Sequence, residues 1–174
     1  GVFGTAARVS QIPNYIEAEP VTVREPGNYL LYMGRFHPIK AVDNLLRGIA
    51  ISDEFRGSRF ILKIAGRGKP DYAESLRALC LELGLEKKVE FVGHVEGLAK
   101  SKLLAGAYFT ILPSHSESFG VVVVESLAQN TPVATSKNTP WSSLERERVG
   151  ICTGNSPAEL AQTIDRVLRM DPNE

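Results

Sequence analysis

The sequence predicts an α/β fold: a Rossmann-like, doubly wound parallel sheet of about six strands in a single domain. Short apolar runs alternate along the chain with longer amphipathic segments, as in successive βαβ units. The 174 residues are 43% apolar, which suits one sizeable core and is too short a chain for two ordinary domains. Helices are therefore expected on both faces of the sheet, with right-handed crossovers between parallel strands.

The expected strands are short runs rich in β-branched and other apolar residues. They span residues 29–33, 59–65, 89–92, 108–112, 133–135 and 149–154. The expected helices have apolar residues at helical spacing and lie at 42–51, 71–85, 97–107, after residue 119 or 120, and at 156–170. Asp71 is the expected N-cap of the second helix, which Gly84 stops. Ser156 should cap the last helix, with Pro157 at its first position.

The segment ESFGVVVVESLAQ contains a conflict between two signals. Four consecutive valines, 121–124, favour a strand by propensity, whereas the residues that follow them favour a helix. The strand is already supplied by the preceding YFTIL. We therefore expect residues 121–124 to form the first turns of a buried helix, in which packing overrides the β preference.

Charge and composition exclude several classes of function. Twenty basic and twenty acidic residues cancel, so no global field favours nucleic acid or an anionic membrane. No apolar run approaches the length of a membrane span. The cysteines, Cys80 and Cys152, fit two reduced thiols better than a metal pair. The histidines, His37, His94 and His115, lack ligand spacing, so a zinc site is not expected.

Ligands of such sheets bind at the carboxyl ends of the strands, where the segment GRFHPIK follows the first strand. Gly34 lets a ligand approach the backbone. Arg35 can grip a phosphate through two donors, and Lys40 adds a point charge. The ordinary alternative is a solvated basic loop. The later segment AGRGKP is better interpreted as a tight turn than as a phosphate loop, and ligand contact by Arg67 is weakly supported.

The segment SHSESFG places Ser118 and Gly120 between a strand and a helix, with Glu117 in the loop and Glu125 inside the helix. A helix that begins near Phe119 or Gly120 would offer free N–H groups to an anion. Carboxylates accept hydrogen bonds from hydroxyls instead. Phosphate donors between two carboxylates suit a nucleotide sugar. The alternatives are that Glu125 compensates the helix dipole and that Glu117 is an ordinary loop acid.

The segment ESFGVVVVESLAQNTPVAT resembles the signature of retaining glycosyltransferases of the GT-B fold, family GT4, in which two glutamates are separated by seven residues. LYMGRFHPIK is similar to the family's Gly-Arg-x-x-x-x-Lys segment. FILKIAGRGKP, VEFVGHV and AYFTILPSHSESFG match its following strands, and SQIPNYIE resembles its interdomain linker. The resemblance covers residues from about 11 to 168.

The resemblance implies the C-terminal, donor-binding domain of a two-domain enzyme, with residues 1–27 as linker or end of a missing N-terminal domain and 28–174 as the donor domain. It implies that Arg35 and Lys40 hold the diphosphate of a UDP-, GDP- or ADP-sugar. The remaining donor-binding residues that it implies are Gly34, His94, Glu117, Ser118, Phe119, Gly120 and Glu125. In this scheme Glu117, with Arg35 and Lys40, serves catalysis by binding the transferred sugar, and Glu125 binds the ribose.

The resemblance further implies that no metal or other cofactor is needed, in keeping with the lack of an Asp-x-Asp pair. The base would lie near residues 93–95. Two positions depart from the family: Ala41 replaces the Gly after the phosphate lysine, and Asn130 replaces the Gly that closes the signature helix. Asn suits the left-handed conformation expected at the second position. The change at Ala41 is expected to be mild.

The expected activity is transfer of a hexose-type sugar, with retention, to a glycan or lipid-linked glycan in polysaccharide biosynthesis. The opening residues do not resemble a natural start, so we expect a fragment that is inactive without its N-terminal domain. We expect a cytoplasmic location, peripheral at the membrane only through that missing domain, and no nucleic-acid partner. A non-catalytic nucleotide-sugar-binding module and a sugar-nucleotide epimerase-like domain stay open as alternatives.

Overall fold

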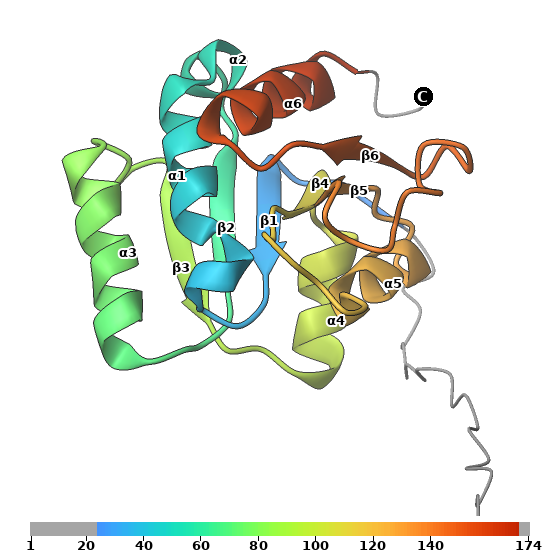
Figure 1. The fold of residues 1–174 in the computed structure, drawn as a ribbon, viewed down its shortest axis with the longest axis horizontal. Helices are drawn as coiled ribbons and strands as arrows, with labels where there is room; N and C mark the ends of the chain where they lie inside the picture. The colour runs from blue at the N-terminus through green and yellow to red at the C-terminus, as the bar shows by residue number, and fades with distance from the viewer. Residues whose placement is uncertain (1–23, 171–174) are drawn as a thin grey trace, which may run out of the picture.

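The computed structural model describes residues 24–170 as one α/β domain built on a six-stranded parallel sheet (Figure 1). The strands are β1 (Tyr29–Met33), β2 (Ile61–Ala65), β3 (Val89–Gly93), β4 (Phe109–Leu112), β5 (Val133–Ser136) and β6 (Gly150–Thr153). The α-helices are α1 (Val42–Ile51), α2 (Asp53–Gly57), α3 (Pro70–Glu82), α4 (Gly97–Ala105), α5 (Val121–Ala128) and α6 (Pro157–Arg169). The predicted fold class is confirmed. No helix among the described residues is long and apolar enough to cross a bilayer.

Helices cover both faces of the sheet, as expected for a doubly wound domain (Figure 1). Leu30 and Tyr32 of β1 face the larger core, which contains residues of α1, α2, α3 and α6. Leu31 and Met33 face a second core that includes Leu104 of α4. Neighbouring side chains of one strand thus point to opposite faces, which explains why the run YLLYM is apolar throughout.

The strand order is β3-β2-β1-β4-β5-β6, the order of dinucleotide-binding Rossmann domains. β1 and β4 pair at the centre of the sheet, with Leu30 opposite Phe109 and Leu31 opposite Thr110. From this pair the chain leads outward in both directions: from β1 to β2, and from β4 to β5. The loops after β1 and β4 therefore diverge and leave a crevice at the carboxyl ends of the strands.

The structure corrects one local expectation and adds two short elements. The N-cap of α3 is Lys69 rather than Asp71, because Pro70 already occupies the first helical position. The short helix α2 is an addition that no expected element covered; Ser52 caps it by accepting a hydrogen bond from Phe55 N–H. Residues Pro38–Lys40 form a separate 3-10 turn ahead of α1. The expected linker, residues 1–27, lies mostly outside the described residues.

The four valines are helical, as predicted, since α5 begins at Val121. The expected burial of this helix holds for one side only. Val123 is fully buried, whereas Val121 is 43% exposed beside the crevice. Ser126 anchors the helix by donating a hydrogen bond to Thr110 Oγ1 of β4, and both residues are buried. Packing of one side of α5 on the sheet is sufficient to override the strand preference of valine.

Asn130 adopts the left-handed conformation predicted for it, with φ of 58°. Ala41 also lies there, with φ of 51° and ψ of 38°, between the 3-10 turn and α1. Its side chain is fully buried. A residue with a Cβ is strained in this region, so the replacement of glycine at position 41 costs more than the mild change expected.

We predict that Ala41→Gly raises the free energy of unfolding by about 0.5–1 kcal/mol, because relief of left-handed strain outweighs the added chain entropy of glycine. Urea denaturation measures this change. Ala78→Gly is the matched control, since Ala78 is exposed within α3 and glycine there should destabilise the protein by about 1 kcal/mol. Equal destabilisation by both substitutions would contradict the strain at Ala41.

Candidate functional site

A cavity of about 890 Å³ lies at the carboxyl ends of β1 to β4, in the crevice where the chain reverses its winding direction. We call it the carboxyl-end cavity. It is lined by residues of the loops after β1, β2 and β3, of α4, and of the β4–α5 region. The polar and glycine residues of its wall are Gly34, Arg35, His37, Lys40, Gly66, Arg67, Gly68, Lys69, His94, Lys100, Glu117, Gly120 and Glu125.

The loops after β1, β2 and β3 are joined by backbone hydrogen bonds. Phe36 N–H donates to Arg67 C=O at 2.9 Å, and Gly66 N–H donates to Gly93 C=O at 2.7 Å. A Cβ at Gly66 would lie 1.9 Å from the carbonyl oxygen of Gly34, so only glycine permits this approach. The segment AGRG is thus a close-packed turn, as interpreted from the sequence, and it forms one wall of the cavity.

Tyr32 supports the loop of residues 34–40 that follows β1, which we call the arginine loop. Its hydroxyl donates a hydrogen bond to the Arg35 carbonyl at 3.0 Å, and its side chain is fully buried. Burial raises the pKa of Tyr32 far above its ordinary value, so the hydroxyl remains a donor. A Cβ at Gly34 would lie 3.0 Å from this hydroxyl, tighter than normal contact. The Arg35 side chain itself is exposed and lines the cavity.

Lys40 and Glu117, the predicted phosphate and sugar residues, contact each other. Lys40 Nζ lies 2.5 Å from Glu117 Oε2, and the two side chains are only 16% and 10% exposed. Ser114, fully buried, donates a second hydrogen bond to the same oxygen at 3.0 Å. The Ser114 carbonyl in turn accepts from Ser136 Oγ of β5. Glu117 is therefore held by two donors, although 77 residues separate it from Lys40.

The start of α5 opens into the cavity at Gly120, the N-cap of the helix. Gly120 has φ of 79°, and a Cβ there would crowd Leu112 and Glu117 at 3.0 and 3.1 Å. The indole of Trp141 donates to the Phe119 carbonyl, and the two rings pack with centroids 5.2 Å apart. These contacts fix the turn that leads into the helix. Val123 N–H already donates to the Gly120 carbonyl at 2.9 Å, so the N–H groups of Val121 and Val122, which precede this first intrahelical bond, are the ones that can serve an anion.

Glu125 forms the second lysine–carboxylate pair of the cavity. Its Oε1 contacts Nζ of Lys100 in α4, and the side chains are 16% and 30% exposed. The wall of the cavity carries five basic side chains and two carboxylates. The basic ones are Arg35, Lys40, Arg67, Lys69 and Lys100. A chain with no net charge thus has a local positive excess at one end of its sheet.

Two of the three histidines, His37 and His94, line the cavity. Nε2 of His94 lies 2.6 Å from Glu96 Oε1. This hydrogen bond lowers the pKa of the exposed Glu96 carboxyl. His115 instead contacts Asn155 through Nδ1. Within residues 24–170, no group of three or more His, Cys, Asp or Glu side chains could hold a metal ion.

Most of the predicted site residues come together around the carboxyl-end cavity. Gly34, Arg35, Lys40, His94, Glu117, Gly120 and Glu125 all line it. Ser118 and Phe119 are not among its lining residues: Ser118 is exposed, and Phe119 packs on Trp141. Sequence reasoning missed Lys100, because it lies inside a helix rather than directly after a strand.

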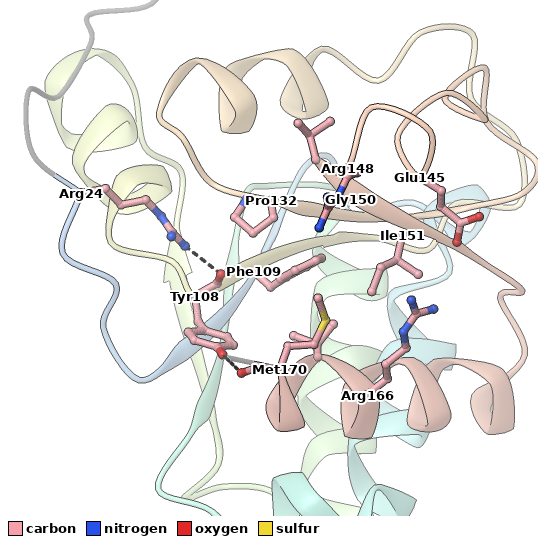
Figure 2. Close-up of a pocket in the computed structure, with 12 residues that line it drawn as sticks. Arg24, Tyr108, Phe109, Pro132, Glu145, Arg148, Gly150, Ile151, Arg166 and Met170 are labelled. Carbon is pink, nitrogen blue, oxygen red and sulfur yellow. Dashed lines mark hydrogen bonds between the residues drawn. The ribbon is translucent and has the colours of Figure 1, made fainter. Parts of the chain in front are cut away.

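A second cavity, of about 670 Å³, lies at the opposite, amino-terminal end of the strands (Figure 2). Phe109, Ile151 and Val167 give it apolar walls, and Arg148 and Arg166 point toward it from opposite sides. Its wall also includes Arg24 and Met170, the first and last described residues, so it borders parts of the chain that the structure does not describe. We assign no ligand to it. Neither the Lys40–Glu117 pair nor the Lys100–Glu125 pair lines this second cavity.

Fold and cavity define a Rossmann-like domain with a cavity at the switch point of the sheet. The sequence matches the family model of glycosyl transferases, group 1, over residues 16–174. The chain therefore belongs to this glycosyltransferase family.

Three known proteins illustrate the relationship. An uncharacterized glycosyltransferase of Methanocaldococcus jannaschii is 32% identical over 150 residues, which cover 85% of this chain and 37% of that protein. The D-inositol 3-phosphate glycosyltransferase of Frankia alni is 32% identical over 151 residues, covering 82% and 37%. The structure of Anabaena HepE in complex with UDP and glucose superposes with a TM-score of 0.68 at 24% identity, covering 82% and 39%. The chain thus spans just over a third of the length of these relatives.

We predict that Lys40 and Glu117 are energetically coupled. Lys40→Met should lower the free energy of unfolding by about 2 kcal/mol, because it leaves a largely buried carboxylate with Ser114 as its remaining partner. Lys40→Met combined with Glu117→Gln should recover about half of that loss. Urea denaturation of the two single variants and the double variant gives the coupling energy. Strict additivity would show that the pair is not formed in solution.

Proposed function

We propose that this glycosyltransferase domain binds a nucleotide-diphospho-sugar in the carboxyl-end cavity and is the C-terminal, donor-binding half of a retaining, GT-B enzyme. The observation that carries the proposal is that one cavity brings together Arg35, Lys40, the open start of α5 and two lysine-paired carboxylates, Glu117 and Glu125. A donor of this class has a negative diphosphate between two hydroxyl-rich sugars. The cavity offers cations and backbone N–H groups for the diphosphate, and carboxylates for the hydroxyls of the sugars.

The diphosphate would lie between the arginine loop and the start of α5. Lys40 has three N–H donors and uses one on Glu117, so it can reach a phosphate oxygen while it keeps the carboxylate in place. Arg35 is exposed at the same rim and supplies a planar, two-donor group. The N-terminus of α5 adds backbone donors at Gly120 and beyond. These groups supply the countercharge without a bound metal.

The same groups would serve the chemical step. Transfer breaks the bond between the anomeric carbon and the diphosphate oxygen, and negative charge then grows on the leaving phosphate. Preorganised cations and helix N–H groups stabilise that charge, which is the largest kind of contribution in such reactions. Glu117 would accept hydrogen bonds from hydroxyls of the departing hexose, and Glu125 from the ribose. We assign no nucleophile to this half.

The proposal also covers the base of the donor, the acceptor and the first donor to test. The base is expected near Gly93, His94 and Val95, where the chain turns at the rim of the cavity. The acceptor, a glycan or lipid-linked glycan, would be held by an N-terminal domain. HepE, which has this fold, binds UDP and glucose, so a UDP-sugar is the first donor to test.

We predict that Lys40→Ala and Glu125→Ala each weaken binding of the cognate nucleoside diphosphate by tenfold or more, through loss of a phosphate contact and a ribose contact. Isothermal titration calorimetry with UDP, GDP and ADP measures this. Lys87→Ala and Glu86→Ala are matched controls, because both residues are exposed before β3, away from the cavity. Unchanged affinity in both site variants would overturn the assignment.

We also predict that the isolated 174 residues bind the donor but transfer no sugar, because the acceptor site belongs to another domain. A radiolabelled-donor assay with a glycan acceptor, run beside a binding measurement, tests this. Sustained transfer by the isolated chain would show that the two-domain assignment is wrong. Binding without transfer by a chain that also carries the N-terminal domain would favour a non-catalytic binding module.

A further inference from the structure

Lys100 enters the carboxyl-end cavity from α4, the helix that packs beside α5 on one face of the sheet. It is the fourth residue of α4, and its ammonium group contacts Glu125 Oε1. The two residues are 25 positions apart in the chain, so the contact depends on the packing of the two helices. Thr131 strengthens that packing by donating a buried hydrogen bond to the Leu104 carbonyl at the end of α4.

The Lys100–Glu125 pair places a donor-only group beside an acceptor-only group. Lys100 contacts one carboxylate oxygen and retains further N–H donors, and the other carboxylate oxygen of Glu125 remains an acceptor. A hydroxyl can donate one hydrogen bond and accept another. Two neighbouring hydroxyls therefore fit the pair better than one does: the first donates to Glu125, and the second accepts from Lys100.

We propose that Lys100 extends the ribose contact already assigned to Glu125: Glu125 accepts from the 3′-hydroxyl and Lys100 donates to the 2′-hydroxyl, so that Lys100 selects ribonucleoside over 2′-deoxyribonucleoside diphosphates. The inference rests on the proposed function and narrows its substrate class. An ion pair on an open surface would be worth little and would need no ligand. This pair instead lines the cavity, where Glu125 is 16% exposed and the ligand would cover it further.

The selection arises when a hydroxyl is missing. A 2′-deoxy ligand covers the pair but leaves one of its polar groups without a partner and cut off from water. Partial exposure of Lys100 limits the penalty, so we expect discrimination of about tenfold rather than several thousandfold. Both ligands carry the same diphosphate, so its contribution cancels when their affinities are compared. The penalty therefore appears in the ratio of the ribonucleotide affinity to the 2′-deoxyribonucleotide affinity.

The test is calorimetric titration of the protein with UDP, GDP and ADP, followed by the 2′-deoxy counterpart of whichever binds most tightly. The wild type should prefer the ribose form by about tenfold. In Lys100→Met the preference should fall to within about twofold. Loss of the lysine charge weakens the binding of both ligands alike, because both carry the same diphosphate. The ratio of the two affinities therefore reports the ribose contact alone. Unchanged thermal unfolding of the variant establishes that the fold is intact.

Lys102→Met is the matched control, since Lys102 is exposed on the same helix and does not line the cavity. It should keep the wild-type ratio. A full tenfold preference in Lys100→Met, or no preference in the wild type, would overturn the role of Lys100 while the donor site stands. Failure of all three ribonucleoside diphosphates to bind the wild type would overturn the proposed function itself.

Discussion

The pairing of β1 with β4 at the centre of the sheet is the constraint on which the site depends. Because β1 leads outward to β2 and β4 leads outward to β5, no crossover covers the loops that follow these two strands. The arginine loop comes from one of them and the start of α5 from the other. Any alternative pairing of the central strands would separate Lys40 from Glu117, whose contact joins the two sides of the crevice.

Charge is organised around that crevice in lysine–carboxylate pairs. Lys40 with Glu117 and Lys100 with Glu125 each join segments distant in sequence, and each pair stays partly open to the cavity. Pairing reduces the cost of holding carboxylates in a partly buried site that, under the proposed function, also attracts a diphosphate. The remaining basic side chains, Arg35, Arg67 and Lys69, leave the cavity positive within a neutral chain.

Local patterns in the sequence predicted the sheet, its helices and most of the lining of the cavity, because strand and helix periods differ and parallel strands end at one edge. What they could not predict depends on distant contacts. Helix α2 is five residues long, and its cap, Ser52, also donates to Asp165 of α6, a contact with no local signal. Lys100 lies inside a helix, so its entry into the site required the packing of α4 on α5. The left-handed Ala41 was hidden because alanine ordinarily favours the helix itself.

We propose that the ligand of this domain is a nucleoside diphosphate bound at the carboxyl ends of the strands. Titration of ¹⁵N-labelled protein with UDP, GDP and ADP, followed by amide chemical shifts, tests it most directly. One nucleotide should produce saturable shifts at Gly34, Gly120 and Val121, with little change at Gly150 and Ile151 in the opposite cavity. Saturable shifts confined to the opposite cavity, or none with any of the three nucleotides, would contradict it.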